Sequence, residues 1–194
     1  MKSSMAIDRS GYVDLLMRKR WNGKVKIITG IRRCGKSYLL STLFKQKLIE
    51  EGVGPDCFIE MALDKVSSAP YRNPNMLYEY VMEKSKDGSK RYYVMVDEIQ
   101  LSYKVRNTSI DESLVPDEDK DMLYTTFYDV LNDLMSRPNL DIYVTGSNSK
   151  MLSKDIFRKI VVLDGNQKLW IDDDGVIYVG VIPFLLEDYI NRGV

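Results

Sequence analysis

The sequence predicts an α/β fold in which helices cover both faces of a parallel β-sheet. Two observations support this prediction. Short segments rich in β-branched and aromatic residues alternate with amphipathic helical segments along most of the chain. Chemically informative residues directly follow three of the four predicted strands, where ligands bind in such sheets. We therefore look for function at the carboxyl ends of the strands.

The elements follow one another as strand, helix, strand, helix, strand, helix and strand. The strands are predicted at residues 24–29, 57–63, 91–96 and 141–146. Helices are predicted at 11–21 with Ser10 as N-cap, at 36–51, at 74–84 after the start signal Asn73-Pro74, and at 120–136. Residues 101–119 are polar and acidic and show no clear period, which indicates a surface insertion.

The C-terminal part has a different pattern. The segments KIVVL, QKLWI and GVIYVGVI are separated by DGN and DDDG, which is typical of short antiparallel strands joined by turns. A last helix, PFLLEDYINR, follows. We therefore predict two units, residues 1–156 and 157–194. The acidic run 172–174 lacks the spacing of a calcium loop and is read as a turn. Trp170 and Tyr178 are interpreted as cross-strand packing partners.

Composition excludes several classes of function. Of 194 residues, 44% are hydrophobic and 29% charged, and 28 basic residues balance 28 acidic ones. This neutral balance gives no support to nucleic-acid or membrane-surface binding. No apolar stretch approaches membrane-span length, and no signal core is seen, so a reduced, cytoplasmic location is expected for a chain with two cysteines. Histidine is absent, which excludes histidine-based catalysis and metal ligation.

The segment Gly30-Ile31-Arg32-Arg33-Cys34-Gly35-Lys36-Ser37 fits the pattern G-x-x-x-x-G-K-[ST] between a strand and a helix. Glycines allow successive N–H groups to converge on a phosphate, and the helix N-terminus adds positive potential. Lys36 is expected on the β- and γ-phosphates, and the Ser37 hydroxyl on Mg²⁺. The predicted nucleotide-binding set is Gly30, Ile31, Arg32, Arg33, Cys34, Gly35, Lys36, Ser37 and Tyr38.

Three side chains of this loop have more than one interpretation. Arg32 and Arg33 either add positive charge to the phosphate site, in contact with the nucleotide or with a neighbouring carboxylate, or they project into solvent. Cys34 is interpreted as a small loop residue and not as a reactive thiol.

The strand RYYVMV ends in Asp97 and Glu98. A carboxylate at this position can hold Mg²⁺, so Asp97 is the predicted metal ligand together with Ser37. The adjacent carboxylate of Glu98 can orient or deprotonate an attacking water. This second acid favours water as the acceptor. Without the upstream phosphate loop, both residues would be read as solvated acids at a strand end.

The fourth strand ends in Thr145, Gly146, Ser147 and Asn148. A polar side chain at this strand end could contact the γ-phosphate and the water. Asn148 is chosen for this catalytic role, with Ser147 as the second choice. The alternative is that Asn148 or Ser149 caps a helix at 149–158.

The segments GIRRCGKSYLL, YYVMVDEIQLS, FYDVLNDL and YVTGSNSKMLS together resemble the bacterial and archaeal AAA-type P-loop ATPases of uncharacterised role. The resemblance covers about residues 10–156. It implies an additional-strand sheet in which the sensor strand lies between the strand of Asp97 and that of the loop. It also implies ATP and Mg²⁺ as cofactors, Lys36 on phosphate, Glu98 as catalytic base and Asn148 as sensor.

After about residue 156 the chain departs from the family pattern. The arginine-containing segment expected next is absent, and residues 159–190 resemble the extreme C-terminus of the family. An internal deletion joined near 156–159 explains this, and an independently evolved tail is the alternative. The fifth sheet strand would then be missing unless the tail replaces it. Arg158 is a weak candidate for the missing transition-state arginine.

The function expected from these residues is Mg²⁺-dependent ATP hydrolysis by in-line attack of water on the γ-phosphate. One alternative is a nucleotide-binding module with negligible turnover, because the arginine and the following domain are missing. A second is a small-molecule phosphotransferase, for which residues 101–119 are the only candidate lid. The expected partner is a nucleotide, and a homo-oligomer or an unknown protein partner stays open.

Overall fold

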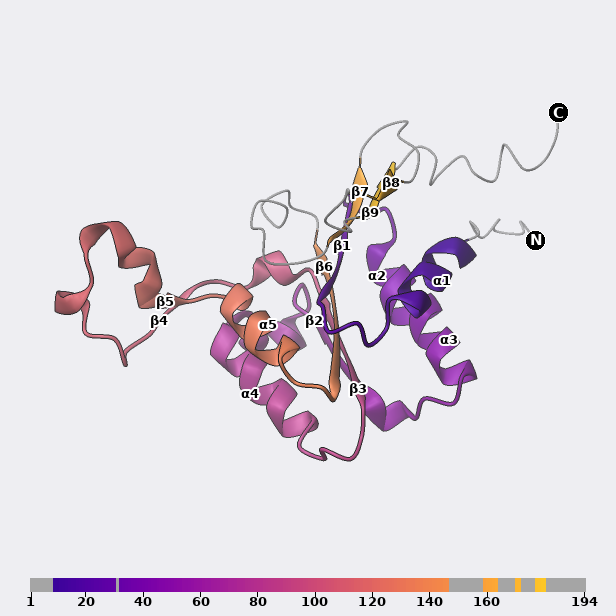
Figure 1. The fold of residues 1–194 in the computed structure, drawn as a ribbon, viewed down its shortest axis with the longest axis horizontal. Helices are drawn as coiled ribbons and strands as arrows, with labels where there is room; N and C mark the ends of the chain where they lie inside the picture. Colours follow the sequence, from indigo (N-terminus) through magenta and orange to yellow (C-terminus); the bar gives the residue numbers. More distant parts are fainter. Residues whose placement is uncertain (1–8, 31, 147–158, 164–169, 172–176, 181–194) are drawn as a thin grey trace.

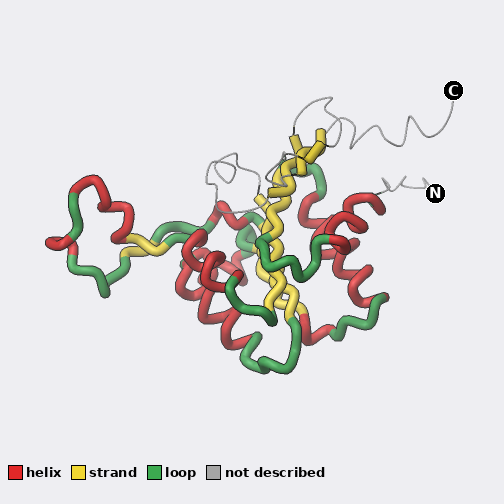
Figure 2. Tube along the Cα trace, in the orientation of Figure 1, coloured by secondary structure: helices red, strands yellow, loops and turns green. Residues whose placement is uncertain are grey.

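The computed structural model describes residues 9–30 and 32–146, and the backbone of three C-terminal strands at 159–163, 170–171 and 177–180. In these residues helices lie on both sides of a central sheet (Figures 1 and 2). One face is covered by α4 (Pro74–Lys84) and α5 (Phe127–Met135), and the other by α1 (Ser10–Arg18), α2 (Lys36–Tyr38) and α3 (Lys45–Glu50). The predicted α/β class is confirmed.

Four neighbouring parallel strands form one side of the sheet. They are β1 (Lys26–Thr29), β2 (Phe58–Ala62), β3 (Tyr92–Asp97) and β6 (Leu140–Gly146), in the order β2-β3-β6-β1. Because all four run in the same direction, their carboxyl ends share one edge. β6 lies between the strand that ends in Asp97 and the strand that enters the phosphate loop. This is the strand order that the family resemblance implies.

The C-terminal strands extend the sheet beyond β1. β7 (Lys159–Leu163) pairs in parallel with β1, and β9 (Ile177–Gly180) pairs in parallel with β7. The tail therefore supplies the fifth parallel strand, and the prediction of an antiparallel C-terminal unit is wrong for β7. β7 pairs with the side of β1 that β6 does not use, so the backbone groups of β1 find partners on both sides.

The antiparallel prediction is correct for the last pair. β8 (Trp170–Ile171) runs antiparallel to β9, and its register places Trp170 opposite Tyr178. The helix predicted at 183–192 lies outside the described residues. The division of the chain after residue 156 stays a prediction.

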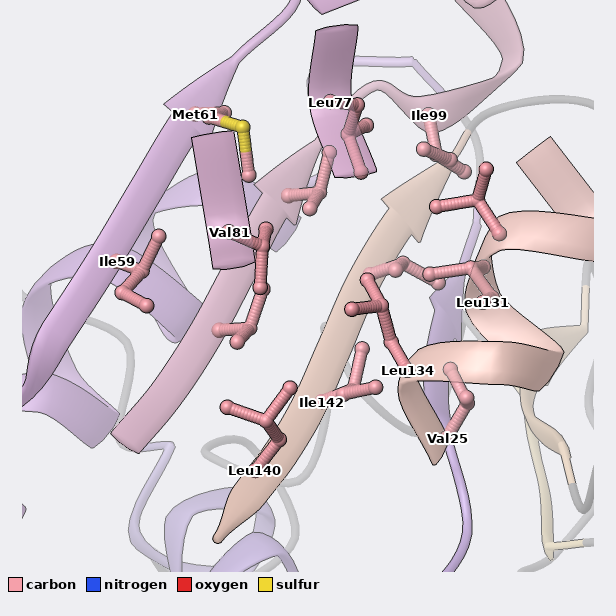
Figure 3. Packing of buried hydrophobic residues seen from close by; sticks show 14 of the residues in the cluster. Val25, Ile59, Met61, Leu77, Val81, Ile99, Leu131, Leu134, Leu140 and Ile142 are labelled. Carbon is pink, nitrogen blue, oxygen red and sulfur yellow. The ribbon is translucent and has the colours of Figure 1, made fainter. Parts of the chain in front are cut away.

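Two hydrophobic clusters, one on each face of the sheet, hold the helices. On β3, Val94 and Val96 belong to the cluster beneath α4 and α5, whereas Tyr93 and Met95 belong to the cluster beneath α1 and α3. This alternation is the period of a strand that is buried on both faces. Figure 3 shows the first cluster, in which side chains of both helices lie against the strands. Each such buried aliphatic side chain contributes about 1.5–3 kcal/mol.

The helix boundaries differ from the predictions in three places. α1 includes Ser10, and Arg9 occupies the N-cap position, so Ser10 is not the cap. The helix after the phosphate loop runs from Lys36 to Glu50 through a π-helical segment, η1 (Leu39–Phe44). α5 begins at Phe127 and not near residue 120, because Thr126 and Asp129 form a capping box that fixes its start.

The remaining residues between β3 and α5 form an insertion. The 3₁₀ turn η4 (Ile99–Leu101) leads to a two-stranded antiparallel sheet, β4 (Val105–Arg106) and β5 (Tyr124–Thr125). The segment between these strands contains the 3₁₀ turns η5 (Glu112–Leu114) and η6 (Asp117–Leu123) and projects away from the sheet (Figure 1). The expected surface insertion is therefore present, and it extends to residue 125.

Two further 3₁₀ segments flank β2. η2 (Pro55–Cys57) leads into the strand, and η3 (Val66–Arg72) connects it to α4. Asn73 caps α4 as predicted, because its side-chain oxygen accepts a hydrogen bond from the backbone N–H of Asn75 at 3.0 Å. Pro74 follows at the first helical position, where its missing N–H carries no penalty.

We expect Tyr143→Phe to change how stability depends on alkaline pH. The Tyr143 side chain is fully buried, and its hydroxyl donates to the Asp141 carboxylate at 2.8 Å. Burial, and then the Asp141 charge, raise the pKa of Tyr143 far above its usual value near 10. The unfolded chain therefore loses this proton near pH 10 while the folded chain keeps it. The contribution of Tyr143 is complete below pH 10 and is lost above it, by about 1.4 kcal/mol per pH unit.

Urea unfolding of the native chain and Tyr143→Phe at pH 8, 10 and 11 measures this effect. Lys26, whose pKa burial lowers, is present in both proteins, so its titration cancels in the comparison. The stability advantage of the native chain is expected at pH 8 and should shrink at pH 11. An advantage that is constant with pH would contradict the buried, protonated phenol.

Candidate functional site

The phosphate loop connects β1 to α2, and a hydrogen bond joins its first and last parts. The Lys36 side chain is 5% exposed, and its ammonium donates to the Gly30 carbonyl at 3.1 Å, across the mouth of the loop. Gly35 has φ +88° at the N-cap of α2, and Arg33 has φ +68°. Left-handed residues at these points turn the chain sharply, which allows N–H groups to converge on an anion. Ile31 lies outside the described residues.

The other loop side chains lie around this turn. Arg32 and Arg33 are exposed, so either of their interpretations remains open. Cys34 is a free, half-buried cysteine. The Tyr38 side chain, one residue after Ser37, is 53% exposed.

Ser37 and Asp97, which are 60 residues apart in sequence, meet at the carboxyl edge of the sheet. The Ser37 hydroxyl donates to Asp97 Oδ1 at 2.9 Å. The same carboxylate oxygen accepts a hydrogen bond from the hydroxyl of Thr145 at the end of β6. The pairing of β3 with β6 brings Asp97 and Thr145 together, because the two strands end side by side. The predicted metal ligands are therefore adjacent.

Glu98 follows Asp97 in a strained backbone conformation. Its φ of +55° places a non-glycine residue in the left-handed region. Two contacts hold it there: its N–H donates to Thr145 Oγ1 at 3.0 Å, and its carboxylate accepts a hydrogen bond from the side-chain amide of Gln100. Such conformations persist where the surroundings over-determine them, and they cluster at functional sites.

Thr145 is a residue of the candidate site that the sequence interpretation does not select. It is fully buried, and its hydroxyl links Asp97 to the backbone of Glu98. The sequence alone favours the amide of Asn148 for this strand end. Its position as the last polar residue of a buried strand was the available signal. Ser147 and Asn148 lie outside the described residues, so the sensor role of Asn148 stays a prediction.

The oxygen atoms of Ser37 and Asp97 fit a Mg²⁺ ion. A hydroxyl and a carboxylate are hard oxygen ligands, and one or two protein ligands are typical where phosphate oxygens and waters complete the shell. Within residues 9–30 and 32–146 we find no group of three or more His, Cys, Asp or Glu residues that could hold a metal without such help. The pair therefore suits an ion that arrives with a nucleotide.

A cavity of about 490 Å³ opens beside this pair. Ser37 and Asp97 form one end, and the loop after β2 forms another wall through Asp64 and Lys65. The insertion between β3 and α5 does not line it. The cavity is large enough for a small polar molecule next to the predicted metal ligands.

A family model described as an AAA domain matches residues 22–162. The chain belongs to the AAA domain family. The matched residues include the phosphate loop, β2, β3, β6 and all but the last residue of β7. The predicted resemblance to AAA-type P-loop ATPases is thereby confirmed.

Individual relatives of this AAA domain are distant. An uncharacterised protein of Haemophilus influenzae is 23% identical over 154 residues, which cover 79% of this chain and 33% of that protein. The chain thus spans about a third of the length of the curated relative it matches. The solved N-terminal domain of zonular occludens toxin from Neisseria meningitidis is 15% identical, with a TM-score of 0.40 over 75% of this chain and 80% of that one.

None of the helices in the described residues combines the length and the apolar character that crossing a bilayer requires.

Proposed function

We propose that the chain binds MgATP at the phosphate loop and hydrolyses it by in-line attack of water on the γ-phosphate. The observation that carries the proposal is the meeting of Ser37 and Asp97 at 2.9 Å beside the loop, with Glu98 as the next residue. Membership of the AAA family supports nucleotide binding and ATPase activity. ATP is preferred over other nucleotides on that ground alone.

Each protein group has a defined task in this proposal. The loop N–H groups and the Lys36 ammonium bind the β- and γ-phosphates, and Lys36 exchanges its contact with the Gly30 carbonyl for phosphate oxygen. Ser37 and Asp97 would hold Mg²⁺, which when bound neutralises charge on the phosphate oxygens. Thr145 keeps the Asp97 carboxylate in place. These groups act by position and charge, which is how phosphoryl transfer is mainly catalysed.

Glu98 acts on the water. Its carboxylate accepts the proton of the attacking water, and the hydrogen bonds to its backbone N–H and to its carboxylate fix the side chain that performs this step. The left-handed backbone at Glu98 directs the chain away from β3 immediately after Asp97. The two adjacent acids can thus take different roles, one toward the metal and the other toward the water.

A binding module with negligible turnover is the main alternative. Transition-state arginines contribute factors of about 10³–10⁵ to rate, and the weak candidate Arg158 lies outside the described residues. The two functions differ in whether turnover depends on Glu98.

Phosphoryl transfer to a small molecule is favoured by one observation. The cavity beside Ser37 and Asp97 could admit an acceptor hydroxyl next to the γ-phosphate. Residues 101–119, the candidate lid for this function, do not line the cavity. Hydrolysis therefore remains the proposed reaction.

Phosphate release and phosphate transfer can be measured together. The chain is incubated with γ-labelled ATP in Mg²⁺ or in excess EDTA, and the fate of the label is followed. We expect inorganic phosphate as the labelled product in Mg²⁺. In EDTA we expect no labelled phosphate, because Ser37 and Asp97 then have no ion to hold against the phosphate oxygens. Release that persists in EDTA would contradict the proposal. Label transferred to an added polyol would favour the phosphotransferase.

A further inference from the structure

Arg9 reaches the phosphate loop from the N-terminus of α1. Its guanidinium donates to the carbonyl oxygen of Gly35 at 2.9 Å and to that of Cys34 at 3.2 Å. The two segments are about 25 residues apart in sequence, so this contact belongs to the tertiary structure. The guanidinium also lies 5.8 Å from the centre of the Tyr38 ring. Arg9 therefore contacts the loop at two consecutive carbonyls and the helix that follows it.

Because the peptide bond is planar, the direction of these two carbonyls determines the direction of the N–H groups that follow them. In a trans peptide the carbonyl and the next N–H point in opposite directions. The carbonyls of Cys34 and Gly35 point toward Arg9, so the N–H groups of Gly35 and Lys36 point away from it. These are the N–H groups at the N-terminus of α2, where a phosphate binds. The Gly35 carbonyl also accepts a hydrogen bond from the backbone N–H of Leu39 at 2.9 Å. Arg9 thus adds a charged donor that holds the Cys34 peptide plane together with that of Gly35.

Close packing adds a second constraint. A Cβ atom at Gly35 would lie 2.3 Å from Arg9 Nη1 and 2.8 Å from Arg9 Cζ. The φ of +88° at Gly35 favours glycine, and a side chain at this position would in addition push the Arg9 guanidinium away from the two carbonyls.

We propose that Arg9 is a positioning residue of the nucleotide site, which aims the N–H groups of Gly35 and Lys36 at the phosphates by holding the carbonyls of Cys34 and Gly35. This inference rests on the proposed function, because it concerns how the same site binds its nucleotide. Arg9 acts through the loop and does not touch the nucleotide. Its removal therefore weakens binding of any ligand that the loop holds by phosphate, whatever the base.

The test is equilibrium binding of a fluorescent ATP analogue with Mg²⁺ to the whole chain. The native protein is compared with Arg9→Ala, with Arg9→Lys and with Arg18→Ala, a control at an exposed arginine in the last turn of α1. Inorganic tripolyphosphate is then used to displace the analogue. Circular dichroism and thermal unfolding without nucleotide verify that each variant is folded.

We expect Arg9→Ala to weaken binding of the analogue by about tenfold to a hundredfold, since two hydrogen bonds to a charged group are lost. Tripolyphosphate affinity should fall by the same factor, because the loop is the shared element. Arg9→Lys should lie between the two, because a single ammonium cannot bind both carbonyls in the same geometry. Arg18→Ala should bind as the native chain does.

Three outcomes would overturn the inference. Native affinity in folded Arg9→Ala would show that the loop needs no support from Arg9. A loss for the analogue without a loss for tripolyphosphate would assign Arg9 to the base or ribose. A native chain that binds neither ligand would refute the proposed function itself, and this inference would fall with it.

Discussion

Glu98→Gln is expected to lower the rate of ATP hydrolysis by about 10²–10⁴-fold, the contribution typical of a positioned general base. The amide has nearly the same size as the carboxylate but cannot accept a proton from water. Thr145 would still bind the backbone of residue 98, so the strained turn stays intact. Nucleotide affinity should therefore be retained, because Lys36, Ser37 and the loop are unchanged.

Single-turnover hydrolysis and equilibrium nucleotide binding, measured on the same preparations, separate the two effects. Glu83→Gln is the matched control, since Glu83 is an exposed carboxylate on α4 that pairs with Lys86. It should hydrolyse ATP at the native rate. If the native chain is no faster than Glu98→Gln although both bind nucleotide, the binding-module alternative is correct. If the native chain hydrolyses ATP at a measurable rate and Glu98→Gln hydrolyses it equally fast, Glu98 is not the base.

The second large effect concerns the opposite end of the same strands. Lys26 on β1 and Asp141 on β6 form a buried ion pair, with side chains 3% and 2% exposed. The other carboxylate oxygen of Asp141 accepts hydrogen bonds from the Trp21 backbone at 3.1 Å and from Tyr143 at 2.8 Å. The pair thus connects β1, β6 and the segment that follows α1 at the starts of the two strands. The register that follows places Thr29, just before the phosphate loop, beside Gly146.

Asp141→Asn is expected to destabilise the fold by about 3–5 kcal/mol, because it leaves the Lys26 ammonium buried without a countercharge. The amide oxygen can still accept hydrogen bonds from Trp21 and Tyr143, so the loss reports mainly the charge. The double variant Lys26→Met with Asp141→Asn should recover most of the stability, since no uncompensated charge remains.

Urea unfolding at pH 7 measures these differences. Glu83→Gln, which removes an exposed ion pair, should unfold at nearly the native urea concentration. Equal destabilisation by Asp141→Asn and by the double variant would mean that the ion pair itself is not what the single substitution disrupts. A single variant as stable as the native chain would contradict the buried charge.

Local patterns in the sequence predicted the parts of the fold that depend on local chemistry. β3 can be predicted from its run of apolar residues, which ends in two acids. α4 can be predicted because Asn73-Pro74 is a local signal for the start of a helix. The start of α5 was placed too early, although Thr126 and Asp129 carry a capping signal. Residues 120–126 are predicted as the first part of this helix, whereas residues 120–123 belong to the 3₁₀ turn η6 and residues 124–125 form β5.

Contacts between distant segments could not be predicted in the same way. The parallel pairing of β7 with β1 depends on which sheet edge is free, and the residues of β7 do not encode that edge. Arg9 was not considered for the site because it lies some 25 residues before the loop that it binds. The link from Thr145 to Asp97 and Glu98 likewise exists only when β3 and β6 lie side by side.

The most direct test of the account is phosphate release from MgATP by the native chain and by Lys36→Ala. Lys36 is buried in the loop and bound to the Gly30 carbonyl, so its replacement removes the phosphate contact at the centre of the site. The account predicts release by the native chain, and its loss in a folded Lys36→Ala variant that no longer binds nucleotide. Equal release by both proteins would contradict it, because hydrolysis would then not take place at this loop.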